Sequence, residues 1–381
     1  MEKRILTTHV GSLPRSPSLV QMMWDLIDGK DVDPVLLDRE IVEATEGVVR
    51  RQLELGIDQV SDGEMSKIGF NNYIHERFSG FGGSAVFAAS DLGAFPDLAA
   101  RLFANDAGAH IPCYRCVAPI ELKDGDAVHR DIARFKGALG DHDPANAFMN
   151  TVTPGQITFN HPNEYYGSHD EYLEAAGRVL SYEYKAITDA GFILQLDSPD
   201  LAMANHFSSA GSDLPEFQTH VRTAIEALNR ALDGIDPARV RLHVCWGNYP
   251  GPHHHDVELG QIIGDLLEAN VKTLSFEAGN PRHEHEWEVF RDIELPDDLV
   301  LMPGLIDVQT NRIEHPRLIA QRIERFADIV GPDRVLAATD CGLSTFAGWH
   351  IVDPEVGWAK LESLVDGARL ASQTLYAGTI N

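Results

Sequence analysis

The stretch Val240-Arg241-Leu242-His243-Val244-Cys245-Trp246-Gly247 shows the unit from which the chain is built. Its first five residues are mostly apolar and predict a short buried strand, and polar side chains follow where that strand ends. His243 and Cys245 are two positions apart, so their side chains lie on one face of an extended chain. The fold therefore depends on how often this unit recurs.

Seven further segments combine an apolar run with a polar end, at residues 5–10, 59–60, 155–159, 192–196, 271–276, 299–305 and 334–338. Stretches with helical periodicity lie at residues 37–55, 172–190, 217–232, 257–267 and 316–330. Alternating strands and helices with apolar strands predict a parallel sheet covered by helices. Eight such units predict an α/β fold, a (β/α)8 TIM barrel, with residues 1–381 as one domain.

Residues 70–150 interrupt this rhythm after the second strand. The segment is rich in glycine, and residues 116–122 have the composition of a strand, so we expect an excursion that contains a hairpin. Cys113-Tyr114-Arg115-Cys116 forms an isolated C-x-x-C motif with no second ligand pair nearby. We interpret it as a structural pair.

Composition excludes several classes of protein. The 31 Lys and Arg residues against 58 Asp and Glu residues give a net charge of −27, which argues against binding to nucleic acid or to an anionic membrane. No stretch reaches the ~18 consecutive apolar residues of a membrane span. With only 4 cysteines and no signal-type apolar segment, we expect a cytoplasmic protein without a disulfide scaffold.

Four side chains at predicted strand ends have the chemistry of metal ligands. His243 and Cys245 follow one strand, Glu277 follows the next, and Cys341 follows the last. In a (β/α)8 barrel the carboxyl ends of the strands meet at one face. One imidazole, two thiolates and one carboxylate form a tetrahedral ligand set for zinc, so Zn2+ is the predicted cofactor.

Such a centre favours chemistry on a thiol. When zinc binds a thiol it lowers the thiol pKa, so that a thiolate forms at neutral pH. Two anionic sulfur ligands make zinc a poor source of hydroxide, which argues against a hydrolase. The predicted function is therefore a zinc-dependent transfer of a methyl or other alkyl group to a thiol, with a small-molecule thiol and an alkyl donor as partners.

Several motifs resemble the cobalamin-independent methionine synthase family, in particular its catalytic C-terminal barrel. The resemblance covers nearly the whole chain, and His243-Val244-Cys245, Glu277 and Asp340-Cys341-Gly342-Leu343 are its most specific part. The remaining matches are Thr8 to Arg15, Asp62 to Glu64, Ala118 to Ile120, Pro154 to Thr158, Leu196 to Pro199 and Gly304 to Val308.

The resemblance implies roles for individual residues. His243, Cys245, Glu277 and Cys341 match the zinc ligands. Glu64 and Asp197 match the carboxylates that hold the amino group of homocysteine, and Ser12 matches the residue near its carboxylate. The sequence also departs from the family, because it has one barrel where full-length members have two.

Two further departures concern the reaction itself. Gln309 stands where the family has its general-acid histidine, so another group must supply the proton. The candidates are His9, His161 and the cluster at residues 253–255. Asn160-His161-Pro162 replaces the family's tryptophan beside the folate, which leaves the alkyl donor open between a methyl-folate, a methyl-corrinoid and an epoxide.

Two alternatives remain at this point. The sequence also resembles the epoxyalkane:coenzyme M transferases, which add a thiol to an epoxide, and Lys67, Arg15 and Arg282 are candidates to bind the sulfonate of coenzyme M. The second alternative is a zinc-stabilised barrel that has lost catalysis. The oligomeric state is open, and a homo-oligomer is compatible with the sequence.

Overall fold

The computed structural model describes residues 3–85, 89–102, 104, 112–207 and 213–377. Six parallel strands form one sheet, in the order β2 (Val60–Ser61), β5 (Ala147–Val152), β6 (Ile193–Asp197), β7 (Val240–His243), β8 (Thr273–Phe276) and β9 (Val300–Pro303). A separate pair, also parallel, joins β1 (Leu6–Thr7) to β10 (Leu336–Ala337).

Hydrogen bonds between these two sheets close the ring. On one side, β9 and β10 are linked by parallel bridges from Leu301 to Val335 and from Gly304 to Ala338. On the other side, the N–H groups of Asp58 and Gln59 donate to the carbonyl oxygen of Thr7 at 3.1 and 3.0 Å. The strands thus form a barrel, which confirms the predicted α/β fold class.

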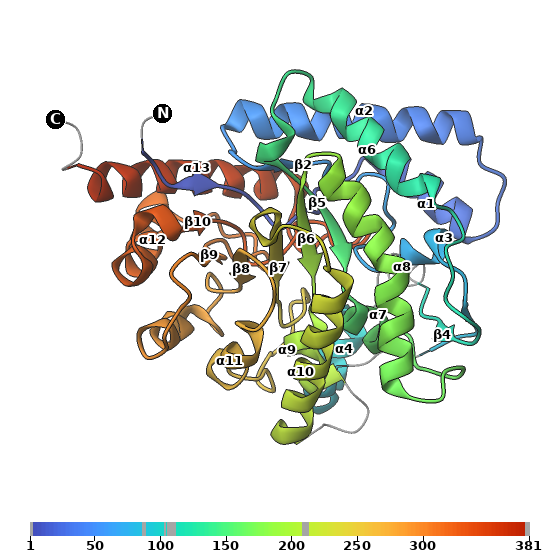
Figure 1. Cartoon of the computed structure of the whole chain (residues 1–381). Helices are drawn as coiled ribbons and strands as arrows, with labels where there is room; N and C mark the ends of the chain where they lie inside the picture. Colours follow the sequence, from blue (N-terminus) through green and yellow to red (C-terminus); the bar gives the residue numbers. More distant parts are fainter. Residues whose placement is uncertain (1–2, 86–88, 103, 105–111, 208–212, 378–381) are drawn as a thin grey trace.

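Helices surround the strands (Figure 1). They are α1 (Pro17–Ile27), α2 (Pro34–Leu55), α6 (Asp126–Leu139), α8 (His169–Asp189), α10 (Leu214–Ala231), α12 (Pro316–Val330) and α13 (Pro354–Leu375). In α2 the side chain of Asp33 accepts from the N–H of Val35, and Gly56 ends the helix with a left-handed φ of 83°. Ile41 and Val48 lie on its buried face, as the periodicity predicts.

The predicted helices at 37–55, 172–190, 217–232 and 316–330 are confirmed by α2, α8, α10 and α12. The prediction of one helix over 257–267 is wrong in extent. That stretch holds two short pieces, η4 (Leu259–Gln261) and α11 (Ile263–Leu266).

One predicted strand is also wrong, because residues 155–159 lie in the helix α7 (Pro154–Asn160). Thr153 caps this helix by accepting from the N–H of Gln156 at 3.2 Å, and Pro154 occupies its first turn. The third strand of the barrel is β5, at the end of the predicted excursion. An apolar run resembles a strand, but a Thr-Pro start followed by Gln three residues after Thr153 is a helix signal.

The excursion contains an antiparallel pair in keeping with the predicted hairpin, but the strand expected over residues 116–122 is reduced to two residues. It includes α3 (Ile74–Arg77), β3 (Phe81–Gly82), η1 (Ser90–Ala94), α4 (Pro96–Leu102) and β4 (Arg115–Cys116). Phe81 pairs with Cys116, and an isolated bridge joins Phe78 to Leu122. A buried ion cluster anchors the excursion to the barrel helices, because Arg77 in α3 bonds to Asp131 in α6 and Glu183 in α8.

The remaining elements are short. They are η2 (Pro144–Asn146), α9 (Asp200–Phe207), η3 (Pro237–Arg239), η5 (Glu284–Arg291) and η6 (Pro332–Arg334). Within the described ranges, none of the helices has the length and apolar character that crossing a bilayer requires.

We expect Arg77→Ala to destabilise the protein by about 3–5 kcal/mol, because it leaves the buried carboxylate of Glu183 without its cation, whereas Asp131 keeps Arg134 at 2.8 Å. The side chains of Arg77, Asp131 and Glu183 are 8%, 5% and 3% exposed. Urea unfolding measures the effect. Arg130→Ala is the control, since the Arg130–Asp124 pair is 51% and 37% exposed and its loss should cost under about 1 kcal/mol. Equal losses in both variants would contradict the anchoring role.

Candidate metal centre and substrate cavity

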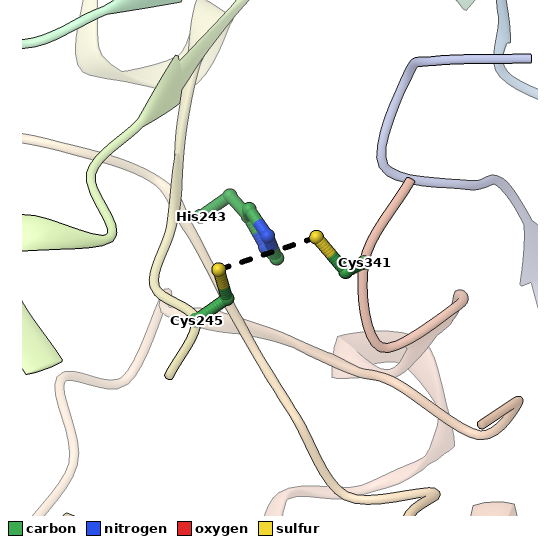
Figure 2. Close-up of side chains that lie close together, drawn as sticks. All are labelled: His243, Cys245 and Cys341. Carbon is green, nitrogen blue, oxygen red and sulfur yellow. Dashed lines mark hydrogen bonds between the residues drawn. The ribbon is translucent and has the colours of Figure 1, made fainter. Parts of the chain in front are cut away.

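Three of the predicted metal ligands converge at one end of the barrel. His243 is the last residue of β7, Cys245 lies two positions further, and Cys341 follows β10. One ligand atom from each lies within 4.8 Å of the other two, and the two sulfur atoms are 4.0 Å apart. Figure 2 shows the three side chains pointing toward one another.

The orientation of His243 fits a metal ligand. Its Nδ1 is hydrogen-bonded to the hydroxyl of Ser275 on the neighbouring strand β8, at 3.0 Å. Its Nε2 is buried and has no hydrogen-bond partner. When Nδ1 donates to Ser275, Nε2 keeps its lone pair, as a ligating imidazole requires. A buried nitrogen beside two sulfurs is a donor set that suits zinc.

The two cysteines form a coupled pair. The Cys341 thiol donates to the sulfur of Cys245, which lowers the pKa of Cys245 and raises the pKa of Cys341. The two sulfur atoms therefore face each other and the same point near His243.

Glu277, the fourth predicted ligand, lies beside this group but outside it. Its Oε1 accepts from the N–H of Trp246 at 2.8 Å, and its Oε2 accepts from the Asn280 amide at 2.6 Å. Burial raises the pKa of Glu277 to about 8. The structure thus brings His243, Cys245 and Cys341 together. It holds Glu277 beside them through the N–H group of Trp246, which follows Cys245.

Asp340 is a positioning residue to which the sequence analysis assigned no role. Its Oδ1 accepts from the N–H groups of Ala278 and Gly279 at 2.9 and 2.7 Å. Its Oδ2 accepts from Asn280 at 3.1 Å. Because Asp340 precedes Cys341, these bonds hold the end of β10 against the end of β8. The Asp-Cys-Gly-Leu motif at residues 340–343 was the sequence signal that could have identified Asp340.

A cavity of about 320 Å³ opens above the cluster. Its lining includes seven of the residues predicted for the site, namely Ser12, Glu64, His161, Asp197, His243, Cys245 and Cys341. The cavity also has an aromatic wall of Phe70, Tyr249, Phe346 and Trp349, which no local sequence pattern indicates, because these residues come from loops far apart in the chain.

Two buried carboxylates face this cavity. Glu64 has a left-handed φ of 59°, which is uncommon for a residue with a side chain, and its Oε2 is buried without a hydrogen-bond partner. Burial raises the pKa of Glu64 to about 7 and also raises that of Asp197. Asp197 accepts from Asn150 at 3.0 Å and from Gln195 at 2.7 Å. A ligand with a positive charge would relieve the cost of burying both acids.

The cations predicted for a sulfonate are occupied elsewhere. Arg15 donates to the carbonyl oxygens of Ser344 and Glu64 at 3.0 and 2.8 Å. Lys67 donates to the carbonyl oxygen of Asn150 at 2.6 Å, and Arg282 faces Glu258 at 3.3 Å. Among the described residues that line the cavity, none is a lysine or an arginine.

His9, predicted as a proton donor, lies outside the cavity lining. Its Nδ1 accepts from the N–H of Gly11 at 3.1 Å, so its Nε2 carries the proton and donates to Gln52 at 2.8 Å. Burial lowers the pKa of His9 to about 4. These contacts give His9 a structural role beneath the site and offer no support for proton donation.

His161, the second predicted proton donor, does line the cavity. Its Nδ1 donates to the carbonyl oxygen of Ile157 at 2.9 Å, which leaves Nε2 to accept from Nε2 of His75 at 2.8 Å. Burial lowers the pKa of His161 to about 4, so the ring is neutral. Gln309 and His253, by contrast, are absent from the described lining of the cavity.

Comparison with known proteins identifies relatives of this barrel. The family described as "Cobalamin-independent synthase, Catalytic domain" matches residues 152–366. A methionine synthase from Thermococcus kodakarensis is 26% identical over 98% of this chain and 96% of its own length. A 2-hydroxypropyl-CoM lyase from Xanthobacter autotrophicus is 30% identical over 40% of this chain and 46% of its own.

A solved structure shows the same fold. The B12-independent methionine synthase from Shewanella sp. W3-18-1, in complex with selenomethionine, superposes with a TM-score of 0.73. The match covers 98% of this chain and 100% of that chain at 20% identity.

We expect Glu64→Gln to stabilise the protein at pH 8 but not at pH 4.5. The pKa of the folded carboxyl is about 7, against an ordinary value of 4.5, so the stability that this group contributes is lost as the pH rises from 4.5 through 7. At pH 8 the amide should restore on the order of 1–3 kcal/mol. Urea unfolding at both pH values measures this.

The matched control is Glu43→Gln, whose side chain is 64% exposed. It should leave stability unchanged at both pH values. A gain for Glu64→Gln that is equal at pH 4.5 and pH 8 would contradict the raised pKa.

Proposed function

This chain belongs to the cobalamin-independent synthase family, and from that premise we propose that it is a zinc-dependent methyltransferase whose acceptor is the thiol of homocysteine. The observation that carries the proposal is the placement of two buried carboxylates, Glu64 and Asp197, in one cavity with a His-Cys-Cys cluster. A thiol with a nearby ammonium group matches both features.

The metal part of the proposal assigns His243, Cys245 and Cys341 as zinc ligands. Glu277 is the fourth, exchangeable ligand, since its carboxylate already has the N–H of Trp246 and the amide of Asn280 as partners. Bound zinc supplies a lowered thiol pKa, so that the acceptor reacts as a thiolate at neutral pH.

The acceptor part rests on charge. Glu64 and Asp197 are buried acids that gain stabilisation from a cation, and an ammonium group can donate to both carboxylates. Asn150 and Gln195 hold Asp197 in place. Ser12, which lines the same cavity, is assigned to the carboxylate end of the acceptor. Fixing both ends aims the sulfur at the metal ligands and lowers the entropic cost of reaction.

His161 remains the candidate for exchanging a proton with the departing group, because it lines the cavity and His9 does not. Its Nε2 faces Nε2 of His75, and both rings are neutral, so the pair must first take up a proton from solvent or substrate; that proton is then shared between the two facing nitrogens. The methyl donor is expected to lie between His161 and the aromatic wall, with the reacting carbon toward the cysteines.

The alternative is addition of a thiol to an epoxide, which the 30% identity to a 2-hydroxypropyl-CoM lyase supports. Its thiol would carry a sulfonate into a cavity that presents two carboxylates. The lack of lysine or arginine in the described lining disfavours that charge arrangement.

We expect Cys245→Ser and Cys341→Ser each to weaken zinc binding by about 100-fold or more, beyond the ~10–100-fold typical of outer-shell changes. Competition with a chelator of known affinity measures this. Cys116→Ser is the control, because Cys116 is buried near Ala118 and away from the cluster. If both cluster variants bound zinc as tightly as the wild type, the assigned ligand set would be wrong.

The acceptor is tested by calorimetric binding of three thiols to the zinc-loaded protein. Homocysteine should bind about 10–100-fold more tightly than 4-mercaptobutanoate, which lacks the ammonium group, because a charge-assisted hydrogen bond contributes ~1.5–3 kcal/mol. Coenzyme M should bind weakest. Glu64→Gln should reduce the difference in affinity between homocysteine and 4-mercaptobutanoate. Tighter binding of coenzyme M than of homocysteine would favour the epoxide reaction instead.

A further inference from the structure

A second cluster of imidazoles around a carboxylate lies behind the wall of the cavity. His206 is near the end of α9, while His253 and Asp256 belong to the loop that follows β7. The side chains of His206 and Asp256 are fully buried, and that of His253 is 7% exposed. One ligand atom from each of the three residues lies within 4.8 Å of the other two. The proposed methyl transfer uses none of them.

The distances within this cluster match those between ligands of one ion. Nδ1 of His206 is 3.4 Å from Oδ1 of Asp256, and Nδ1 of His253 is 3.0 Å from Oδ2 of the same carboxylate. Ligands of a tetrahedral zinc ion are about 3.3 Å apart, since each bond to nitrogen or oxygen is about 2.0–2.1 Å.

The outer contacts that support metal ligands are already present. Nε2 of His253 donates to the carbonyl oxygen of Tyr249 at 2.9 Å, and its Nδ1 is hydrogen-bonded to Oδ2 of Asp256 at 3.0 Å, a contact that a bound ion would replace. Oδ2 of Asp256 accepts from Nε2 of His283 at 2.9 Å, and Nδ1 of His283 in turn bonds to Glu286 at 2.7 Å. A ligating histidine that donates its other N–H to a carbonyl, and a ligating carboxylate with its own donor, are typical of metal sites.

Two further features indicate that this cluster binds a ligand in addition to its internal hydrogen bonds. Oδ1 of Asp256 is buried and lacks a hydrogen-bond partner, although such an oxygen is costly to remove from water. His253 has a left-handed φ of 54°, a strained conformation for a residue with a side chain. Strain of this kind persists where the surroundings hold a side chain in one functional direction.

We propose that His206, His253 and Asp256 form a second metal site, for a divalent first-row transition ion such as Zn2+. Two imidazoles and one carboxylate are the ligands that borderline ions of this class prefer, and they leave one position open. The ion would tie α9 to the loop after β7. Met203, one turn before His206, and Tyr249 both line the substrate cavity, so the ion would fix the shape of its wall.

The experiment titrates metal-free protein with Co2+ and records the absorption spectrum. A site with cysteine ligands gives strong thiolate-to-cobalt charge-transfer bands in the near ultraviolet, whereas a site with only nitrogen and oxygen ligands gives weak visible bands. We expect one equivalent of each kind. The weak visible bands should persist in Cys245→Ser and disappear in His206→Asn. The charge-transfer bands should disappear in Cys245→Ser and persist in His206→Asn.

A matched control addresses adventitious binding at the protein surface. Glu258 and His285 are exposed and form a candidate metal-binding group with the buried Glu286, so Glu258→Gln should leave both sets of bands intact. Thermal melting provides a second readout, because Co2+ or Zn2+ should raise the melting temperature of Cys245→Ser but not of the double variant with His206→Asn. This also shows whether His206→Asn is folded.

Two results would overturn the second site. One is a single bound equivalent that Cys245→Ser abolishes. The other is a second equivalent that survives His206→Asn but is lost in Glu258→Gln. Neither result affects the proposed methyl transfer, which depends on the cysteine-containing site alone.

Discussion

The bonds between the Asp340 carboxylate and the N–H groups of Ala278 and Gly279 are the contacts on which the candidate site depends. They join the ends of β8 and β10, which the intervening β9 would otherwise keep apart. Gly304, directly after β9, leaves room for this contact, since a Cβ there would approach the backbone of Asp340 to 2.4 Å. Cys341 follows Asp340, so the same contact sets where its sulfur meets Cys245.

Beneath this contact, the barrel interior is polar as well as apolar. The buried guanidinium of Arg241 donates to Gln195 at 2.7 Å and lies over the ring of Phe148 at 3.5 Å. Gln195 donates in turn to Asp197. A continuous chain therefore runs from the barrel floor to a cavity carboxylate. Satisfied networks of this kind specify one arrangement, and removing a member leaves buried groups unpaired.

The two carboxylates that face the cavity affect both the stability of the protein and its affinity for a ligand. Burial raises the pKa of both Glu64 and Asp197, although the nearby cation Lys67 acts to lower it. Such an arrangement destabilises the ligand-free protein and strengthens the attraction for a cationic group. The backbone strain at Glu64 adds to the same effect. Sites that bind a charged ligand tightly are often the least relaxed part of a fold.

The sequence by itself determined the alternation of strands and helices, the strand ends and the order of the ligand residues, because these follow from local periodicity and from side-chain chemistry. It misplaced the third strand, since Gly155 to Phe159 are apolar enough to resemble one and the capping by Thr153 decides for a helix. Only the tertiary structure decided which residues meet. His9 and His161 have similar chemistry, yet packing places one beneath the site and the other in the cavity. The cluster of His206, His253 and Asp256 joins a helix to a distant loop, and no local pattern encodes a contact that forms only when the barrel closes.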